Sequence, residues 1–329
     1  MITWGIEEEV FVIESKVKLR PSLQSLYYLA KLFWRDPLFY YKGSSSNFSR
    51  GRDIILGLMS GVEITTGIHR NLYSLLKDFQ KRRKELGQAC EGLIVPMGHL
   101  ITGDTPTNVC ALQIHIGGVT NEKNYYNLAY FLPLLFLLTA SSPLRDRSYY
   151  GQSYRLAAGY AIGPPEHQPS YRFQDIIFSR RLGTIEVKIF DPCWDLQRIR
   201  VLLEALLAII KIKERLPFNI DEYRRQRWEA ARYGYTTGLK ELHRKLNDYY
   251  PIDRRFFLKT PADEIYYLYK NEGVWATYSA LDNAYRQGEF KPHKVREIRI
   301  NPFKIGAGFF GYYLLRLPYR AWKYWRDWR

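Results

Sequence analysis

The amino-acid sequence predicts an α+β fold, with an antiparallel or mixed β-sheet and helices packed on one of its faces. Up to about residue 195, short segments that alternate apolar and polar residues are mixed with helical segments, and beyond that point the patterns are helical only. We expect a single domain over residues 1–329. Its parts are a sheet-bearing part at about 1–195, a helical part at about 196–300 and a basic, aromatic tail at about 301–329.

The composition is that of a globular protein with a basic surface. Apolar residues make up 46% and charged residues 25% of the 329 residues, which is enough for a large buried core. The 49 basic and 33 acidic residues give a formal net charge of +16. This excess favours anionic partners, such as nucleotides, phosphates, nucleic acid or a membrane surface.

The elements follow from the period of the apolar residues, which is two in strands and about 3.6 in helices. The predicted strands lie at residues 2–13, 61–66, 110–118 and 183–190. The first predicted helices lie at 22–34, 69–88 and about 123–140. The Gly-Ser stretch at 43–51 and the Gly- and Pro-rich stretch at 141–170 are predicted loops. The predicted helices of the second part lie at 196–215, 220–233, 238–248, 261–270 and 274–287.

One apolar segment raises the question of a membrane. The run from Asn124 to Leu144 has no charged residue and is long enough to suggest a membrane-spanning helix. Polar side chains and Pro133 interrupt it, so we expect a buried core helix and keep a membrane span as the alternative. The N-terminus has no basic leader before an apolar run, so we expect no signal peptide. Three cysteines without zinc or redox spacing predict a reduced, cytoplasmic protein.

Each predicted strand has an apolar face and a face with acid, imidazole or amide groups, because successive side chains point to opposite sides. In chain order, the polar faces carry Glu7 and Glu9, Glu63 and Thr65, Gln113 and His115, and Thr184, Glu186 and Lys188. If the four strands are neighbours in one sheet, five of these side chains gather on its second face. These five are Glu7, Glu9, Glu63, His115 and Glu186.

Carboxylates packed so closely repel one another unless cations neutralise them. Magnesium fits the set, because it prefers hard oxygen ligands and phosphate substrates, and one His is compatible with magnesium or manganese. The sequence has no Cys/His cluster that would indicate structural zinc. The alternative is that these are ordinary solvent-facing strand positions, since the sequence alone does not show that the strands are neighbours.

Five motifs then occur in an order that resembles a known family. They are GIEEE at 5–9, GVEITT at 61–66, QIHIG at 113–117, ASSP at 140–143 with SYR at 153–155, and RLGTIEVKIFD at 181–191. This set is similar to the bacterial and archaeal glutamate–cysteine ligase type 2 group, the carboxylate–amine ligases, over about residues 2–215. The last motif is the most specific, and Gln113 stands where many members have a second His.

The resemblance implies a single catalytic domain like that of glutamine synthetase, in which a curved antiparallel sheet forms a funnel with helices on its outer face. It implies two or three magnesium ions held by the five polar-face residues. The implied reaction uses ATP to phosphorylate a substrate carboxylate, such as the glutamate γ-carboxylate. An amine such as cysteine then attacks the acyl phosphate, which releases phosphate and leaves an amide.

The same resemblance assigns roles to three basic residues. Lys188 and Arg155 would be catalytic, in contact with phosphate or with the substrate carboxylate, where Arg can bind in a bidentate way. Together with Arg181, they would bind the nucleotide.

The tail from Leu317 to Arg329 interleaves basic and aromatic residues. This pattern favours packing within the chain or in a homo-oligomer, with contact to a membrane surface or to nucleic acid as alternatives. An alternative function for the whole chain is a basic protein that binds nucleic acid or a membrane surface on a catalytically degenerate ligase fold. Without metal, however, the gathered carboxylates would repel phosphates. We therefore expect small-molecule partners, an amino acid and an amine.

Overall fold

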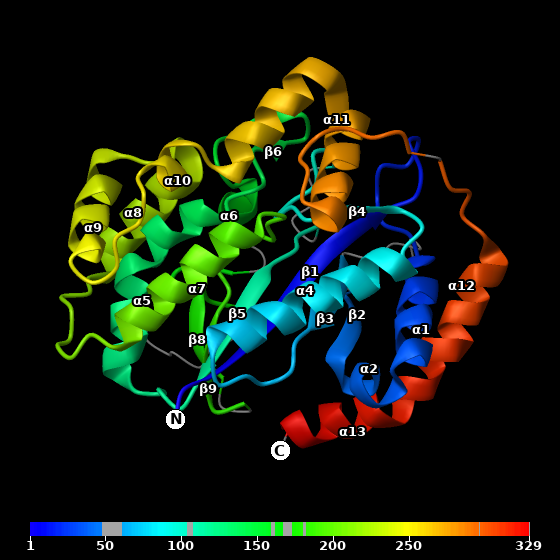
Figure 1. The fold of residues 1–329 in the computed structure, drawn as a ribbon, viewed down its shortest axis with the longest axis horizontal. Helices are drawn as coiled ribbons and strands as arrows, with labels where there is room; N and C mark the ends of the chain where they lie inside the picture. Colours follow the sequence, from blue (N-terminus) through cyan, green and yellow to red (C-terminus); the bar gives the residue numbers. More distant parts are fainter. Residues whose placement is uncertain are drawn as a thin grey trace.

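The computed structural model describes residues 1–47, 61–103, 108–158, 162–166, 173–179, 182–295 and 297–328. Its centre is an antiparallel sheet in which the long strand β1 lies between strands that come much later in the sequence (Figure 1). The strand order is β2 (Ser44–Asn47), β3 (Gly61–Thr65), β1 (Thr3–Ile13), β5 (Leu112–Gly117), β9 (Thr184–Val187) and β8 (Ile176–Ser179). A further strand, β4 (Leu93–Val95), pairs with the end of β1, and β6 (Leu144–Arg145) and β7 (Ser148–Tyr149) form a separate hairpin.

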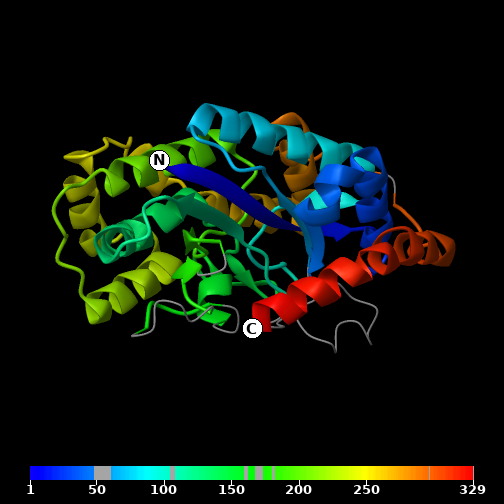
Figure 2. The same cartoon turned by 90° about the horizontal axis from the view of Figure 1, so that it is seen from below.

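The helices fill the sequence between and after the strands. The sheet-bearing part contains α1 (Ser25–Arg35), α2 (Pro37–Gly43), α4 (Leu72–Ala89), α5 (Glu122–Leu135) and α6 (Tyr154–Ala158). The remainder contains α7 (Leu196–Ile210), α8 (Ile220–Tyr233), α9 (Thr237–Asn247), α10 (Arg255–Leu258), α11 (Pro261–Gln287), α12 (Pro302–Gly308) and α13 (Leu317–Trp328). Figure 2 shows α4 and α7 on one side of the sheet and α13 on the other.

The apolar face of the sheet is covered by helices, as predicted. Ile6 of β1, Ile114 of β5 and Val187 of β9 are buried in one core with Phe79 of α4 and Leu206 of α7. Toward β3 this face continues into a second core formed with α1. The pairings between the strands of this sheet are antiparallel, so the described sheet is antiparallel and not mixed.

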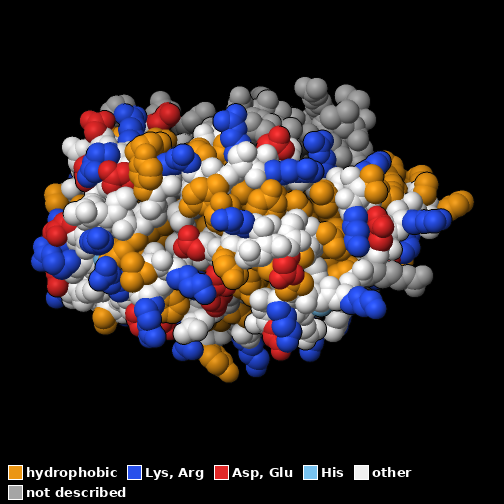
Figure 3. Space-filling view, turned by 90° about the horizontal axis from the view of Figure 1, so that it is seen from above, with side chains coloured by type: hydrophobic (Ala, Val, Ile, Leu, Met, Phe, Trp, Pro, Cys, Tyr) orange, Lys and Arg blue, Asp and Glu red, His pale blue; other side chains and the backbone are white. Residues whose placement is uncertain are grey.

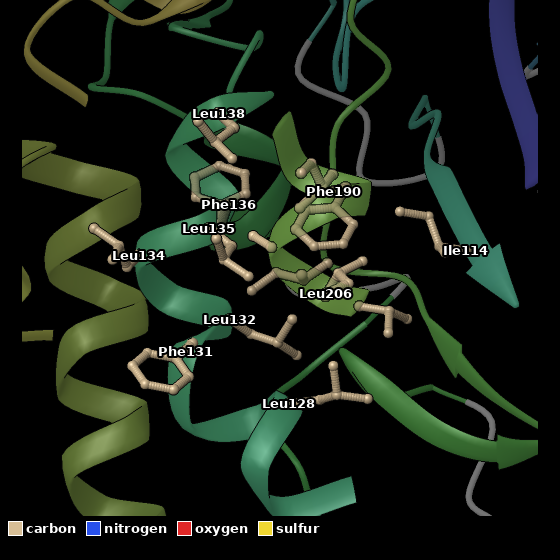
Figure 4. Close-up of a cluster of buried hydrophobic side chains, with 14 of the residues drawn as sticks. Ile114, Leu128, Phe131, Leu132, Leu134, Leu135, Phe136, Leu138, Phe190 and Leu206 are labelled. Carbon is tan, nitrogen blue, oxygen red and sulfur yellow. The ribbon is translucent and has the colours of Figure 1, made fainter. Parts of the chain in front are cut away.

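The apolar run at 124–144 forms α5 and the 3₁₀ turn Phe136–Leu138 that follows it. Its large side chains are buried in the core: some of them face Phe190 and Leu206 of α7, whereas Phe131 and Leu134 point toward a helix on the other side of α5 (Figure 4). The expected core helix is therefore confirmed. None of the described helices is both long enough and apolar enough to span a membrane.

The predicted elements match the described ones where the apolar period repeats over a long segment. The two helices predicted at 261–270 and 274–287 are joined as α11, but Gly273 breaks the helix with φ 79° and ψ −178°, a conformation that favours glycine. Of the described strands of the main sheet, the predictions missed three short ones, β2, β4 and β8. Their sequences, SSSN, LIV and IIFS, show no alternation, and β2 lies inside the predicted loop at 43–51. The predicted loop at 141–170 contains the β6–β7 hairpin and α6.

The segment from α12 onward returns to α1. Gly308 allows this approach, because a Cβ atom there would lie 2.4 Å from the backbone nitrogen of Tyr27. One turn later Tyr312 is fully buried, with its ring 6.3 Å from that of Phe33. Arg316 is also buried and donates from Nε to the carbonyl oxygen of Tyr41 at 2.8 Å. The inner stripe of residues 308, 312 and 316 therefore attaches this segment to the body of the protein.

One acidic side chain is buried away from the polar face of the sheet. Glu14 follows β1 and is 2% exposed, and neither carboxylate oxygen has a hydrogen-bond partner in the described part of the chain. Burial raises the pKa of Glu14 to about 8, and the neighbouring Ser22 lowers it only in part. A carboxyl group in this environment destabilises the fold when it ionises.

We predict that Tyr312→Ala lowers the free energy of unfolding by about 3 kcal/mol or more, because it removes a fully buried ring from the contact with α1. Urea unfolding measures the loss. Phe310→Ala is the matched control, because Phe310 lies two residues away and is 64% exposed. The control should change stability by no more than about 0.5 kcal/mol. Equal losses for both variants would contradict the docking of this segment.

We predict that Glu14→Gln stabilises the protein at pH 8. The pKa of Glu14 in the folded protein lies above its ordinary value of 4.5, so between about pH 4.5 and 8 the folded state binds more protons than the unfolded state. Stability is therefore lost as pH rises through this window, by at most about 1.4 kcal/mol per pH unit for one carboxyl group. Unfolding experiments at pH 5 and pH 8 should show an advantage of the variant that grows with pH. Glu241→Gln, on the exposed surface of α9, should show no such gain.

Candidate active site

The five acidic and imidazole residues predicted for the polar face lie on neighbouring strands. Glu9 of β1 is paired in register with Glu63 of β3, and His115 of β5 is paired with Glu186 of β9. Glu7 lies two residues before Glu9, on the same face of β1. The strands β3, β1, β5 and β9 are consecutive in the sheet. The four strands are therefore neighbours, which the sequence alone did not show.

Glu9 is the most buried carboxylate of β1 on this face. Its Oε2 accepts a hydrogen bond from the backbone N–H of Ala111 at 3.0 Å, and its Oε1 accepts from Nε2 of Gln113 at 3.4 Å. Burial and, next, the negative charge of Glu63 raise the pKa of Glu9 to about 8, although Arg155 opposes this shift. Glu9 therefore holds a proton more readily than an exposed glutamate does, and a bound cation would favour its ionised form.

His115 and Lys188 supply positive charge to the same face. Nε2 of His115 lies 3.6 Å from Oε1 of Glu7, and its Nδ1 lies 3.4 Å from the hydroxyl of Thr184. Burial alone would lower the pKa of His115, but Glu7 and Glu186 outweigh burial and raise it. Nζ of Lys188 forms an ion pair with Oε1 of Glu186 at 2.9 Å. The face can thus bind cations through its carboxylates and anions through Lys188.

Glu8 points to the opposite face of β1 and has a structural role. It is fully buried and forms an ion pair with Arg83 of α4, whose Nε donates to its Oε2 at 3.0 Å. The hydroxyl of Tyr285, from α11, donates to the same oxygen at 3.0 Å. One buried carboxylate therefore ties β1 to two helices that are distant in the sequence.

Arg155 lies in a buried network behind the strand that carries Glu186. Its Nη1 donates to the carbonyl oxygen of Ile189 at 2.9 Å and to Oδ1 of Asp191 at 3.2 Å, and its Nη2 donates to the carbonyl oxygen of Lys188 at 2.8 Å. Asp191 also accepts from the hydroxyl of Ser142 at 2.8 Å. The terminal nitrogens of Arg155 are therefore directed at protein oxygens, and these contacts fit a residue that positions the chain at 188–191.

A second buried pair supports the same region. Asp175 accepts from Nε of Arg227 at 2.6 Å and from the hydroxyl of Tyr223 at 2.7 Å, and its carbonyl oxygen accepts from the backbone N–H of Lys188 at 2.7 Å. Sequence reasoning missed the roles of Glu8, Asp191 and Asp175. Glu8 and Asp191 stood within the quoted motifs, but only the packing shows that their carboxylates are buried. Arg181, the third predicted nucleotide-binding residue, lies outside the described residues.

The donor chemistry of the polar face fits magnesium. Four carboxylates and one imidazole share the face, and a cation would offset the burial and the charge of Glu63 that raise the pKa of Glu9. Within the described ranges, no group of three or more His, Cys, Asp and Glu side chains is close enough to hold a metal ion by itself. Magnesium commonly takes one or two carboxylates together with waters and substrate phosphates, so it does not require such a preformed cage.

Comparisons with known proteins give one distant relative by sequence and several solved structures with the same fold. No protein-family model matches the chain. A putative glutamate–cysteine ligase 2 from Rhodospirillum rubrum is 28% identical over a region that covers 41% of this chain and 44% of that protein. The chain therefore spans less than half the length of this relative.

Solved structures share the fold. A glutamate–cysteine ligase from Francisella tularensis, in complex with AMP, superposes with a TM-score of 0.57 and 9% identity over 94% of this chain and 92% of that one. A bifunctional glutathione synthetase from Pasteurella multocida superposes with a TM-score of 0.55 and 11% identity over 87% of this chain and 51% of that one. The chain is thus a distant homologue of glutamate–cysteine ligase 2 and has the fold of the carboxylate–amine ligases.

Proposed function

We propose that the protein is an ATP-dependent carboxylate–amine ligase that joins a carboxylate, such as the glutamate γ-carboxylate, to an amine such as that of cysteine. The observation that carries this proposal is the polar face of the sheet. Pairs of acidic and imidazole residues lie directly opposite each other on β3 and β1, and on β5 and β9. A structural relative with the same fold is known in complex with AMP, which supports nucleotide binding by this chain.

In this proposal Glu7, Glu9, Glu63, His115 and Glu186 hold magnesium, with manganese as a possible substitute. When bound, the metal would neutralise phosphate charge and so assist phosphoryl transfer from ATP. The buried position of Glu9 favours this role. A bound cation would favour the ionised form of Glu9, which burial and, next, the charge of Glu63 disfavour.

Lys188 is the basic residue that we assign to direct contact with substrate or phosphate. It shares the polar face with Glu186, and a cation bound by Glu186 would weaken their ion pair. The ammonium group would then be able to hold an anionic oxygen. We assign Arg155 a positioning role, because it binds the carbonyl oxygens of residues 188 and 189 and so orients the chain next to Lys188.

The direct test is ADP release from ATP and Mg²⁺ in the presence of glutamate and a panel of amines that includes cysteine. We expect ADP release that depends on both the acid and the amine, with one amide formed per ADP. Omitting either substrate or adding a chelator should abolish it. Nucleotide binding without ADP release for any acid–amine pair would contradict the proposal and favour a degenerate fold that binds but does not catalyse.

We predict that Glu186→Gln lowers turnover by about 100-fold or more and keeps the fold. The substitution removes a charge that supports metal, and several kcal/mol of transition-state stabilisation correspond to such a factor. The shape of the side chain is kept, so no cavity forms. Glu241→Gln is the matched control, because Glu241 is paired with Arg244 on the exposed surface of α9. Normal turnover in a folded Glu186→Gln protein would remove Glu186 from the proposed metal site.

A further inference from the structure

The segment from α12 to α13 is a continuous rod on the outside of the molecule. α12 is followed by the π-helical turn Phe309–Tyr313, the 3₁₀ turn Leu314–Arg316 and α13, and the residues at each junction have helical backbone angles. At 1.5 Å per residue, residues 302–328 extend over roughly 40 Å. This rod is bent: in Figure 1, α12 runs beside α1, and the chain then turns so that α13 lies below α2.

The outer side of this rod is apolar, which reverses the usual pattern of a surface helix. Its inner stripe is Gly308, Tyr312 and Arg316. An outer stripe runs along the opposite side at helical spacings of seven, four, three and eight residues. The outer stripe consists of Phe303, Phe310, Leu314, Leu317 and Trp325, which are between 39% and 89% exposed.

Other exposed apolar side chains extend the outer stripe. Phe309, Leu315 and Trp322 are also exposed on the rod, and Trp34 of α1, 63% exposed, lies beside Gly311. Hydrophobic side chains gather, with Lys and Arg among them, at the end of the molecule where α12 lies (Figure 3). A large exposed apolar patch on a folded protein often marks a surface that binds another molecule.

The positive charge of the segment indicates an anionic partner. Residues 301–329 contain six basic residues and one acidic residue, and four of the six lie between Arg320 and Arg329. Three tryptophans lie among these four, at 322, 325 and 328. Tryptophan and arginine interleaved along one helix are characteristic of segments that lie in the interface of an anionic bilayer.

We propose that the outer stripe places the protein on the surface of an anionic lipid bilayer, with the rod parallel to the membrane plane. The inner stripe holds the rod on α1, so the apolar side is already presented and needs no refolding. A second copy of the chain fits this surface less well. A symmetric contact would bring the basic ends of two chains, each with a net charge of +16, close together.

The experiment is vesicle flotation with the full-length protein. The vesicles are pure phosphatidylcholine, or phosphatidylcholine with about one third phosphatidylglycerol. We expect binding to the anionic vesicles that falls at high salt, and at least about tenfold weaker binding to the neutral ones. Bound protein should also show a blue shift of tryptophan fluorescence.

The variant Phe310→Ser/Leu314→Ser/Trp325→Ser removes three members of the outer stripe without touching the inner stripe. It should bind anionic vesicles at least about tenfold more weakly while keeping the wild-type circular dichroism and melting temperature. The matched control is Leu258→Ser/Tyr267→Ser, which changes exposed apolar residues of α10 and α11 and should bind like the wild type.

Two results would overturn the proposal. One is equal binding of the wild type and the outer-stripe variant to anionic vesicles. The other is a wild-type dimer in analytical ultracentrifugation that the outer-stripe variant abolishes, together with no vesicle binding, since this would assign the surface to a second copy of the chain. ADP release measured without lipid reports separately on the proposed ligase activity.

Discussion

The alternation of side chains along β1 is the constraint on which the site and the core both depend. Glu7 and Glu9 point to one face of the sheet, and Glu8, between them, points to the other. Arg83 and Tyr285 hold Glu8 in the core, so β1 cannot slip by one residue without burying the wrong carboxylates. Removing one partner of such a buried pair typically costs about 3–5 kcal/mol, because the other charge is left uncompensated.

The neighbouring strands extend this constraint across the sheet. The antiparallel register places Glu63 opposite Glu9, and Glu186 opposite His115. The acidic side chains therefore share one face because of the register in which the strands pair. Behind them, Asp191 and Asp175 hold Arg155 and Arg227 in buried ion pairs. The charges that position the backbone are therefore paired within the protein, whereas the polar face gathers four carboxylates together with His115 and Lys188. This difference supports a site for a cationic cofactor and an anionic substrate.

The rod formed by α12 and α13 follows a different rule from the other surface helices. α9, for example, buries Leu239, Leu242 and Leu246 and exposes charged residues, while the rod packs a narrow stripe on the body of the protein and leaves a wider apolar side outside. Glycine at 308 makes this possible, because the backbone of α1 lies where a Cβ atom would be. The rod is thus attached to the fold by few residues and presents many to an external partner.

The sequence by itself determined the features that arise from local periodicity. The α+β class, the long helices, the break near Gly273 and the common polarity of four strands could all be predicted, because periods of two and 3.6 are properties of short segments. The short strands β2, β4 and β8 were missed, since three or four residues without alternation contain no such signal. Only the tertiary structure decided which strands are neighbours, that Glu8 and Glu9 are buried while Glu7 is half-buried, and that the guanidinium of Arg155 is held by Asp191. These outcomes depend on contacts between residues that are far apart in the chain, such as Glu8 and Tyr285, and no local pattern encodes a partner 277 positions away.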